Sequence, residues 1–282
     1  MIKSLGKTDF DTLFTAFNTA FRDYEMQVNK HELSVMLQRR GFNAELSFGA
    51  FEDEKLVSFT FNGTGFFNGI KTAYDTGTGT LEEYRGRGLA TQIFEYSLPF
   101  LKQNGIRQYL LEVLQHNTKA INVYKKLGFK VSREFSYFVQ DADNVLVSEH
   151  ILPSEYKIQE IDLSRKEEMV LLWDFFPSWQ NSFEAILRRP DDFIILGVFD
   201  DTRLAGYGIL DPNSGDITQI AVSKDYCRQG IGSGIFNELL KVNKFKTVKA
   251  VNAEISCVSM KLFFESKNLP KKGKQFEMIR AL

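Results

Sequence analysis

The sequence predicts a mixed α/β protein made of two tandem domains of one fold, residues 1–152 and 153–282. The first observation behind this prediction is the stretch TLEEYRGRGLAT, Thr80 to Thr91, where strand-like alternation gives way to a glycine-bearing turn and a helix start. The second is that the same order of segments repeats beyond Pro153. With 282 residues and 43% hydrophobic content, the chain is long enough to build two packed cores.

The segments before this turn have the periodicity of two helices followed by two strands. Phenylalanines and leucines recur at helical spacing over 9–22, and a second helix is expected over 31–40. Strands are expected at about 45–52 and 55–62, around the polar turn EDE. A glycine- and phenylalanine-rich connection, Gly63 to Ile70, then leads into the strand that ends at the turn.

The segments after the turn complete the first domain. A helix is expected from Leu89 to Leu101, because its leucines and isoleucine stand near helical spacing. Tyr109 to Phe129 has the pattern of a buried strand, a short loop, a helix and a glycine stop. Two closing strands are expected at Phe129 to Val139 and Val145 to Leu152, around the polar turn QDADN.

The turn itself has the physical properties of an anion site. The first amides of a helix lack intrahelical partners, and the aligned peptide dipoles leave partial positive charge there. Gly86 and Gly88 let an oxyanion approach the backbone. Arg85 and Arg87 add full charges, and an arginine fork suits the paired oxygens of a pyrophosphate. A dinucleotide fingerprint fits less well, because Thr91 occupies its third glycine position and no acidic ribose partner can be assigned.

Two motifs carry a resemblance to a known family. Arg85-Gly86-Arg87-Gly88-Leu89-Ala90 resembles the R/Q-x-x-G-x-G/A signature of the GCN5-related N-acetyltransferase (GNAT) superfamily. Asn117 to Phe129 resembles its second signature, N-x-x-A-x-x-x-Y-x-x-x-G-F, at every named position. The resemblance implies acetyl-CoA as co-substrate, with its pyrophosphate on the loop amides and no metal. It assigns the binding of acetyl-CoA to Thr80, Leu81, Arg85, Gly86, Arg87, Gly88, Leu89, Ala90, Thr91, Asn117 and Tyr124.

Two of these assignments concern backbone and amide groups beside the reacting bond. In the family, the backbone that corresponds to Thr80 and Leu81 polarises the acetyl carbonyl, so the same role is expected here. Asn117 is expected to hold the pantetheine arm or to cap the helix that follows it, and the cap alone would justify an asparagine.

The chemistry requires a proton acceptor for the attacking amine. An alkylammonium has a pKa of about 10.4, so a base or a chain of waters must remove a proton before attack. Glu112, in the strand LLEVL, stands where acetyltransferases with a similar LEV motif carry their proposed base. Its apolar neighbours are expected to raise its pKa by desolvation. Asp75 and His116 are weaker alternatives, because neither stands at a position that the family matches.

The departing thiolate requires a hydrogen-bond donor. The family match assigns this role to Tyr124. Free tyrosine, with a pKa of about 10, is a weaker acid than a thiol near 8.5, so complete proton transfer runs uphill by roughly 2 kcal/mol. Stabilisation of the sulfur is therefore the expected role.

The second half is expected to keep the fold and to lack the chemistry. Cys227 replaces Arg85, while Gly230 replaces Gly88, so weak binding of a CoA-like anion through the backbone remains open. The same alignment places Asn252 opposite Glu112 and Phe264 opposite Tyr124; a slip in it would bring Glu254 or Glu265 into consideration. All turnover is therefore expected in residues 1–152.

Composition narrows the function classes. A net charge of −1 and a pI near 6.4 argue against nucleic acid as a partner. Cys227 and Cys257 provide neither a disulfide framework nor a zinc spacing, and no apolar run resembles a signal or a membrane span. We therefore expect a cytoplasmic N-acetyltransferase that acts on a small-molecule or peptide amine. The alternative is a non-catalytic CoA-binding sensor or scaffold.

Overall fold

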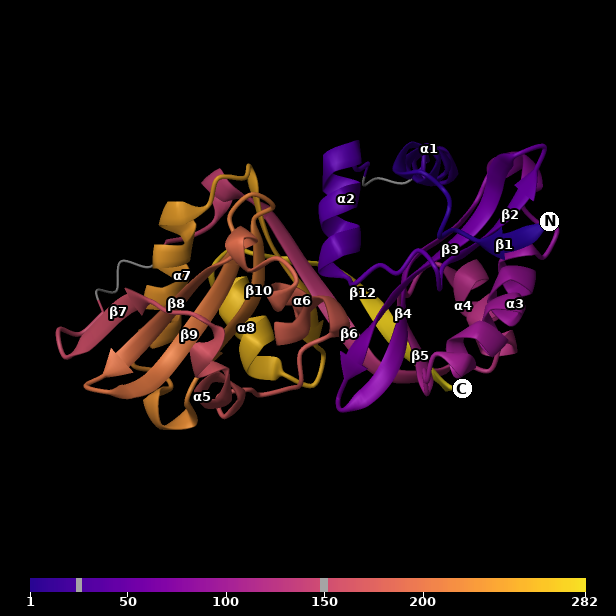
Figure 1. Ribbon diagram of the computed structural model, residues 1–282. Helices are drawn as coiled ribbons and strands as arrows, with labels where there is room; N and C mark the ends of the chain where they lie inside the picture. The colour runs from indigo at the N-terminus through magenta and orange to yellow at the C-terminus, as the bar shows by residue number, and fades with distance from the viewer. Residues whose placement is uncertain (24–26, 148–151) are drawn as a thin grey trace. The chain divides into compact units, whose positions relative to one another are not determined.

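The computed structural model describes residues 1–23, 27–147 and 152–282, and the chain forms two compact units (Figure 1). Unit 1 is Met1–Ser132 together with Phe276–Leu282, and unit 2 is Arg133–Gln275. This division differs from the expected boundary between residues 152 and 153. The reason is an exchange of closing strands, because the last strand of each repeat belongs to the unit that the other repeat builds.

Unit 1 is a mixed sheet with helices on both faces. Its strands lie in the order β1-β2-β3-β4-β5-β12. Their bounds are Ile2–Ser4 (β1), Phe48–Glu52 (β2), Lys55–Phe67 (β3), Ile70–Thr80 (β4), Gln108–Leu114 (β5) and Lys271–Ala281 (β12). The helices are α1 (Phe10–Ala20), α2 (Lys30–Arg39), α3 (Leu89–Gln103) and α4 (Thr118–Lys126).

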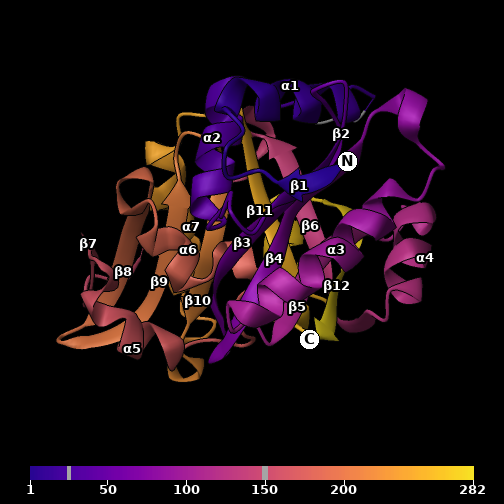
Figure 2. The same cartoon turned by 45° about the vertical axis from the view of Figure 1, so that its right-hand side comes forward.

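The helices cover the sheet of unit 1 in two pairs. α1 and α2 lie on one face, and α3 and α4 lie on the other (Figures 1 and 2). Phe17 of α1 packs on Phe59 and Phe61 of β3, with ring centroids 6.2 Å apart in both contacts. On the opposite face, Phe94 of α3 packs at 5.1 Å from the ring of Tyr109 in β5. Each face of the sheet therefore has its own apolar layer.

The expected connection between Gly63 and Ile70 is instead part of a long hairpin. β3 continues to Phe67, and β4 begins at Ile70. Asn68 and Gly69 form the tight turn between them, with φ of 49° and 74°, a conformation that asparagine and glycine adopt at low cost. The glycines in this stretch weakened the strand pattern in the sequence, but pairing along the whole of β4 stabilises it.

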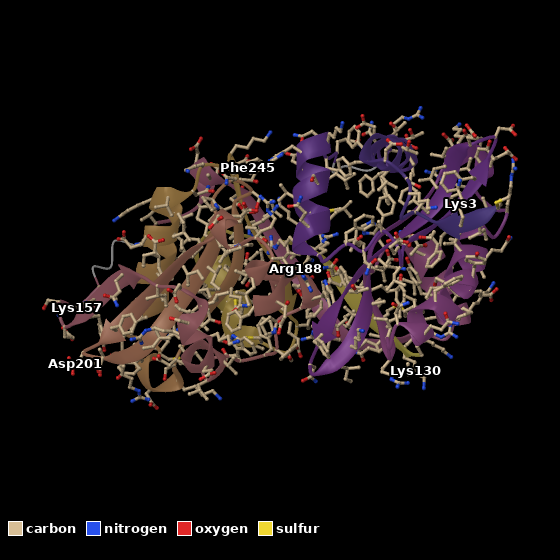
Figure 3. All side chains as sticks on the ribbon, viewed as in Figure 1. Lys3, Lys130, Lys157, Arg188, Asp201 and Phe245 are labelled. Carbon is tan, nitrogen blue, oxygen red and sulfur yellow. The ribbon has the colours of Figure 1, made fainter. Side chains whose placement is uncertain are left out.

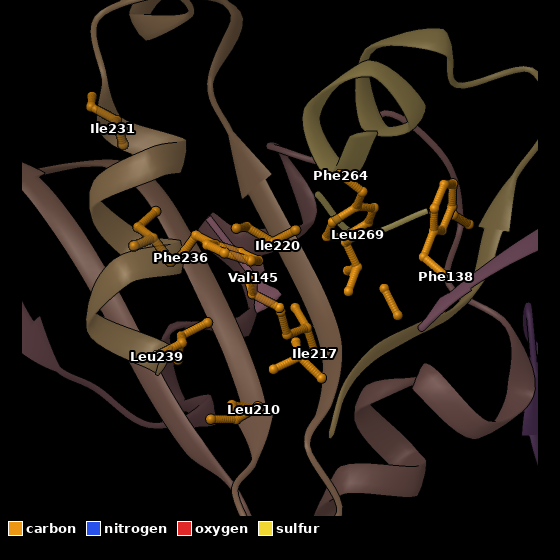
Figure 4. Packing of buried hydrophobic residues seen from close by; sticks show 14 of the residues in the cluster. Phe138, Val145, Leu210, Ile217, Ile220, Ile231, Phe236, Leu239, Phe264 and Leu269 are labelled. Carbon is orange, nitrogen blue, oxygen red and sulfur yellow. The ribbon is translucent and has the colours of Figure 1, made fainter. Parts of the chain in front are cut away.

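Unit 2 repeats this plan with strands in the order β6-β11-β10-β9-β8-β7. The strand bounds are Lys130–Asp141 (β6), Tyr156–Glu160 (β7), Ile194–Asp200 (β8), Arg203–Asp211 (β9), Asp216–Val222 (β10) and Thr247–Glu254 (β11). The helices are α5 (Lys166–Val170), α6 (Phe183–Leu187), α7 (Ile231–Val242) and α8 (Val258–Ser266). Apolar side chains of β10, α7 and α8 form its main core (Figure 4).

The end of the first repeat differs from the expectation of a closing hairpin. β6 enters unit 2 and pairs antiparallel with β11, from Asp141↔Thr247 to Phe135↔Glu254. The expected strand at Val145–Leu152 is not found over 145–147, and 148–151 lie outside the described residues. Unit 1 is closed instead by the end of β12, where Leu282 N donates to Arg107 O over 2.9 Å.

Charged side chains lie on the surface of both units. Figure 3 labels four charged side chains that are exposed to solvent, Lys3, Lys130, Lys157 and Asp201. Within residues 1–23, 27–147 and 152–282, no helix is long and apolar enough to cross a membrane.

Candidate active site

The site in unit 1 begins where two parallel strands stop pairing. β4 and β5 pair only at Thr72↔Gln108, Ala73↔Tyr109 and Tyr74↔Leu110. Beyond these pairs the register between β3 and β4 shifts, so that Thr76 is an extra residue, a β-bulge. The carboxyl ends of β4 and β5 therefore separate, and side chains from both faces of the sheet can reach the gap between them.

The predicted anion loop follows β4 directly. A 3₁₀ turn at Glu82–Tyr84 leads to Gly86 and Gly88, whose φ values of 80° and 74° are left-handed. Gly88 is the N-cap of α3, which has no side-chain cap and runs for 15 residues. The first amides of α3 are thus available to an anion, and a Cβ at Gly86 would have no neighbour within 4 Å. This geometry is that of an anion-binding helix N-terminus.

The two arginines of the loop donate hydrogen bonds to main-chain carbonyl groups. Arg85 Nη2 donates to Ala20 O at 2.9 Å, and Arg85 Nε donates to Thr80 O at 3.2 Å. Arg87 Nη2 donates to Glu83 O at 3.0 Å, and its guanidinium lies 4.8 Å from the ring centroid of Tyr84. These hydrogen bonds hold the loop in shape. Both side chains are also exposed, so they add positive charge beside the loop.

The remaining predicted binding residues lie at the same end of the sheet. Asn117 Oδ1 accepts from Ala120 N at 3.1 Å, which makes Asn117 the N-cap of α4. The Leu81 amide donates to Val57 O at 2.9 Å, so this amide is already used and the expected polarisation of an acetyl carbonyl would need a different one. His116, the weaker candidate base, is exposed in the turn before α4.

Glu112 lies on the α1/α2 face of the sheet. Its neighbours Leu111 and Val113 belong to the core under α3 and α4, and strand side chains alternate, so Glu112 projects to the opposite side. There it shares a hydrogen bond with the buried hydroxyl of Tyr74. Burial, together with the charge of Glu112, raises the pKa of Tyr74 well above its ordinary value. The hydroxyl of Tyr74 therefore stays protonated and donates to the carboxylate.

Tyr124 reaches the gap from the α3/α4 face. Its hydroxyl donates to Asp75 Oδ2 over 3.1 Å. Burial raises the pKa of Asp75, against hydrogen bonds from Thr78, Tyr124 and Gly77 that lower it. The structure thus places Glu112 and Tyr124 on opposite faces of the separated strands, and it places Asp75 beside Tyr124 and not beside Glu112.

The comparison with family models decides what this arrangement belongs to. The model of the acetyltransferase (GNAT) family matches residues 10–129 and again residues 156–256. The chain belongs to the GNAT family. Both repeats of this GNAT protein carry the match, which confirms the tandem organisation that the sequence predicted.

Known proteins support the same assignment. N-alpha-acetyltransferase 30 of Schizosaccharomyces pombe is 28% identical over 101 residues, which make up 35% of this chain and 67% of that relative. An N-alpha-acetyltransferase of Sulfurisphaera tokodaii is 32% identical over 76 residues, so this chain spans only 46% of that relative's length. A solved tandem GNAT protein from the clavulanic acid biosynthesis pathway has the same fold, with a TM-score of 0.76 at 12% sequence identity. The match covers 100% of this chain and 98% of that protein's chain.

Unit 2 of this GNAT protein has the same separation of strands, but its own chain bridges the gap. β10 and β11 pair only at Asp216↔Lys249. Beyond that point Asn181 Nδ2 donates to Val251 O at 2.7 Å, and Asn181 O accepts from Gln219 Nε2 at 2.5 Å. Asn181 thus connects the two strands. The cavity beside it is lined by apolar side chains such as Trp173 and Phe264 and by polar ones such as Gln219 and Asn252.

The replacements expected in unit 2 align as the sequence indicated. The turn before α4 has a hydrogen bond from Asn117 N to Leu114 O, and the turn before α8 has the corresponding one from Cys257 N to Glu254 O. Aligning the two turns places Phe264 opposite Tyr124. Asn252 then stands opposite Glu112 and is buried, with its Nδ2 donating to Ser178 Oγ at 2.8 Å. Gly230 keeps the left-handed conformation of Gly88, with φ of 85°.

Proposed function

We propose that unit 1 is an acetyl-CoA-dependent N-acetyltransferase that moves an acetyl group to a primary amine by direct attack. The observation that carries the proposal is the placement of Glu112 and Tyr124 on opposite faces of the sheet, at the gap between β4 and β5. An amine that enters beside Glu112 can attack a thioester whose sulfur lies beside Tyr124. The sheet then separates the side of proton removal from the side of thiol departure.

Each part of the site has a distinct task in this reaction. The uncapped N-terminus of α3 binds the pyrophosphate and orients the thioester toward the gap. Glu112 removes protons from the attacking ammonium, directly or through water, and Tyr74 holds the carboxylate in place. Tyr124 stabilises the sulfur as the carbon–sulfur bond breaks.

We assign no turnover to unit 2. Its gap is bridged by Asn181, and the positions of Glu112 and Tyr124 hold Asn252 and Phe264, which offer neither a proton acceptor nor a hydroxyl. The uncapped N-terminus of α7 behind Gly230 still leaves room for an anion. Unit 2 therefore serves stability or shapes the substrate in this proposal.

The test is coenzyme A release from acetyl-CoA with a panel of amines, covering small alkylamines, aromatic amines and peptides with a free N-terminus. Peptides are included because two relatives are named N-alpha-acetyltransferases. The wild type should release coenzyme A with at least one class, and Glu112→Gln with Tyr124→Phe should not. Residual acetylation in this double variant that Gly230→Asp abolishes would move the chemistry to unit 2. Binding of acetyl-CoA without release for any amine would favour the alternative, a CoA-binding sensor or scaffold.

A further inference from the structure

Asp75 and Tyr124 form a hydrogen-bonded pair at the point where β4 and β5 stop pairing. Tyr124 Oη donates to Asp75 Oδ2 over 3.1 Å. The same carboxyl group accepts from Thr78 Oγ1 at 2.8 Å and from Gly77 N at 2.9 Å. Three donors from two elements, the Tyr124 hydroxyl among them, therefore fix this carboxyl group in place.

Unit 2 has lost both members of this pair together. The bulges align Asp75 with Ile217, because Asp75 pairs with Asn62 just before one register shift and Ile217 pairs just before the other. Phe264 stands opposite Tyr124, and both replacements lie in one apolar core (Figure 4). Two apolar side chains thus satisfy packing at these positions. The polar pair of unit 1 must serve something that packing does not require.

We propose that Asp75 is a positioning residue and proton reserve for Tyr124, so that the two groups deliver one proton to the departing thiol. This inference rests on the proposed function of unit 1. When the carbon–sulfur bond of the thioester breaks, its electron pair goes to sulfur. For this step the hydrogen bond between the two groups reverses: the protonated Asp75 Oδ2 donates to Tyr124 Oη, and the Tyr124 proton turns to the sulfur. Tyr124 Oη then gives its proton to the sulfur and takes the proton of Asp75 Oδ2.

The proton balance closes through solvent. Asp75 is left as a carboxylate and takes a proton from solvent before the next turnover. The ammonium loses two protons on the side of Glu112, so the complete reaction releases one proton. Without Asp75, Tyr124 would be left as a tyrosinate, which is unfavourable because tyrosine is a weaker acid than the thiol. A carboxylic acid is a stronger acid than tyrosine, so a proton passed on from Asp75 makes protonation of the thiolate favourable.

The surroundings of Asp75 favour a proton on it. Burial is the main cause that raises its pKa, while Arg40, at the end of α2, lowers it. The other titratable groups that face it are the hydroxyls of Tyr74 on β4, Tyr109 on β5 and Tyr124 on α4. The pKa values of Tyr74 and Tyr109 are raised well above the ordinary value by burial, so neither brings a negative charge near neutral pH.

The first test measures the pair without turnover. Aspartate labelled with ¹³C at its carboxyl carbon reports the titration of Asp75 by NMR in the full chain, and Asp75→Asn identifies its signal. We expect a midpoint above the ordinary value near 3.9. In Tyr124→Phe the midpoint should rise further, because the lost hydrogen bond favours the carboxylate. Asp211→Asn is the matched control. The Asp211 carboxylate also accepts hydrogen bonds from the turn that follows it, from Asn213 N and Ser214 Oγ, but it lies in unit 2. An ordinary midpoint that Tyr124→Phe leaves unmoved overturns the pairing.

The second test measures coenzyme A release against pH. Asp75→Asn should lower kcat about tenfold or more with little change in the KM for acetyl-CoA, and it should remove the fall of kcat as pH rises through the pKa of Asp75. Asp75→Asn with Tyr124→Phe should be no slower than Tyr124→Phe alone. Full kcat in Asp75→Asn, or a double variant slower by the product of both effects, overturns the relay. A wild type without release contradicts the proposed function and the relay with it, while the titration still decides whether the two groups are coupled.

Discussion

At the scale of single residues, the candidate site is a set of hydroxyl–carboxyl contacts that join positions far apart in the chain. Glu112 bonds to Tyr74, and Asp75 bonds to Tyr124. The signatures of the sequence indicated Glu112 and Tyr124, but neither partner. A motif records which residues follow one another, whereas these contacts depend on where β4 bends at its bulge. Asp75 entered the sequence analysis only as an alternative base, and the structure places it beside Tyr124 and not beside Glu112.

Replacing Glu112 by Gln should slow acetyl transfer about 100-fold at neutral pH, because a neutral amide cannot accept the proton of the amine. The acidic limb of the pH–rate profile should shift as well. Tyr74→Phe is the matched control, since it removes the hydrogen bond to Glu112 and leaves the carboxylate, and its loss should be smaller. An acidic limb that stays in place in Glu112→Gln would locate the base elsewhere.

Replacing Tyr124 by Phe should lower kcat by about 100-fold and change the KM for acetyl-CoA little, because the hydroxyl acts mainly on the departing sulfur. Steady-state kinetics at saturating amine would measure the change in kcat separately from the change in the KM for acetyl-CoA. Wild-type kcat in this variant would leave Tyr124 with a packing role, the role that Phe264 has in unit 2.

The raised pKa of Asp75 also predicts how stability changes with pH. Burial disfavours the ionised carboxyl, so the wild type should lose stability relative to Asp75→Asn as pH rises through the folded pKa of Asp75. Below the unfolded value near 3.9, both states hold the proton and this penalty is absent. Thermal unfolding of both proteins over a pH series would show it. A constant difference in Tm across the series would mean that Asp75 titrates alike in both states.

At the scale of elements, the anion loop is a turn that hydrogen bonds from its own arginines stabilise. The sequence predicted the loop and the helix after it, because both depend on local signals, the glycines and the helical periodicity. It did not predict that Arg85 would bind the end of α1, since that contact joins distant segments. The sequence analysis also underestimated the length of β3. Glycines in its second half are typical of loops in a sequence, and only the pairing with β4 shows that they belong to a strand.

Gly88→Ala should weaken acetyl-CoA binding and lower the stability of unit 1. A left-handed φ costs a side-chain-bearing residue about 1 kcal/mol, and relief of this strain would tilt the first amides of α3 away from the pyrophosphate. Gly230→Ala is the matched control, because it introduces the same strain at the corresponding turn of unit 2. Calorimetry should find weaker binding in Gly88→Ala only. Equal loss in both variants would mean that both loops bind the ligand.

At the scale of the whole molecule, the two repeats are joined by exchange of their closing strands. The sequence revealed the repeat, which the family match confirmed. It could not reveal the exchange, because β12 has the same alternation whichever strand it pairs with, and only tertiary packing selects the neighbour. Met278 of β12 is fully buried among residues of α3, α4 and β5, so the end of the chain is part of the core of unit 1.

Removal of Phe276–Leu282 should therefore unfold unit 1 or destabilise it severely, although the deleted residues lie far in sequence from the candidate site. Met278→Ala is the milder version, and its cavity should cost about 2–5 kcal/mol. Thermal unfolding with coenzyme A release would measure both effects. Retention of wild-type Tm and activity after the deletion would show that β12 is dispensable for the fold of unit 1.

The exchanged strand also sets an order of events during synthesis. Domains generally fold as they leave the ribosome, the N-terminal one first. Here the unit with Glu112 and Tyr124 is translated early, yet its sheet lacks an edge until Phe276–Leu282 has emerged. The nascent chain must keep the open side of β5 unpaired while all of unit 2 is made. The unit that is translated first is therefore the unit whose sheet is completed last.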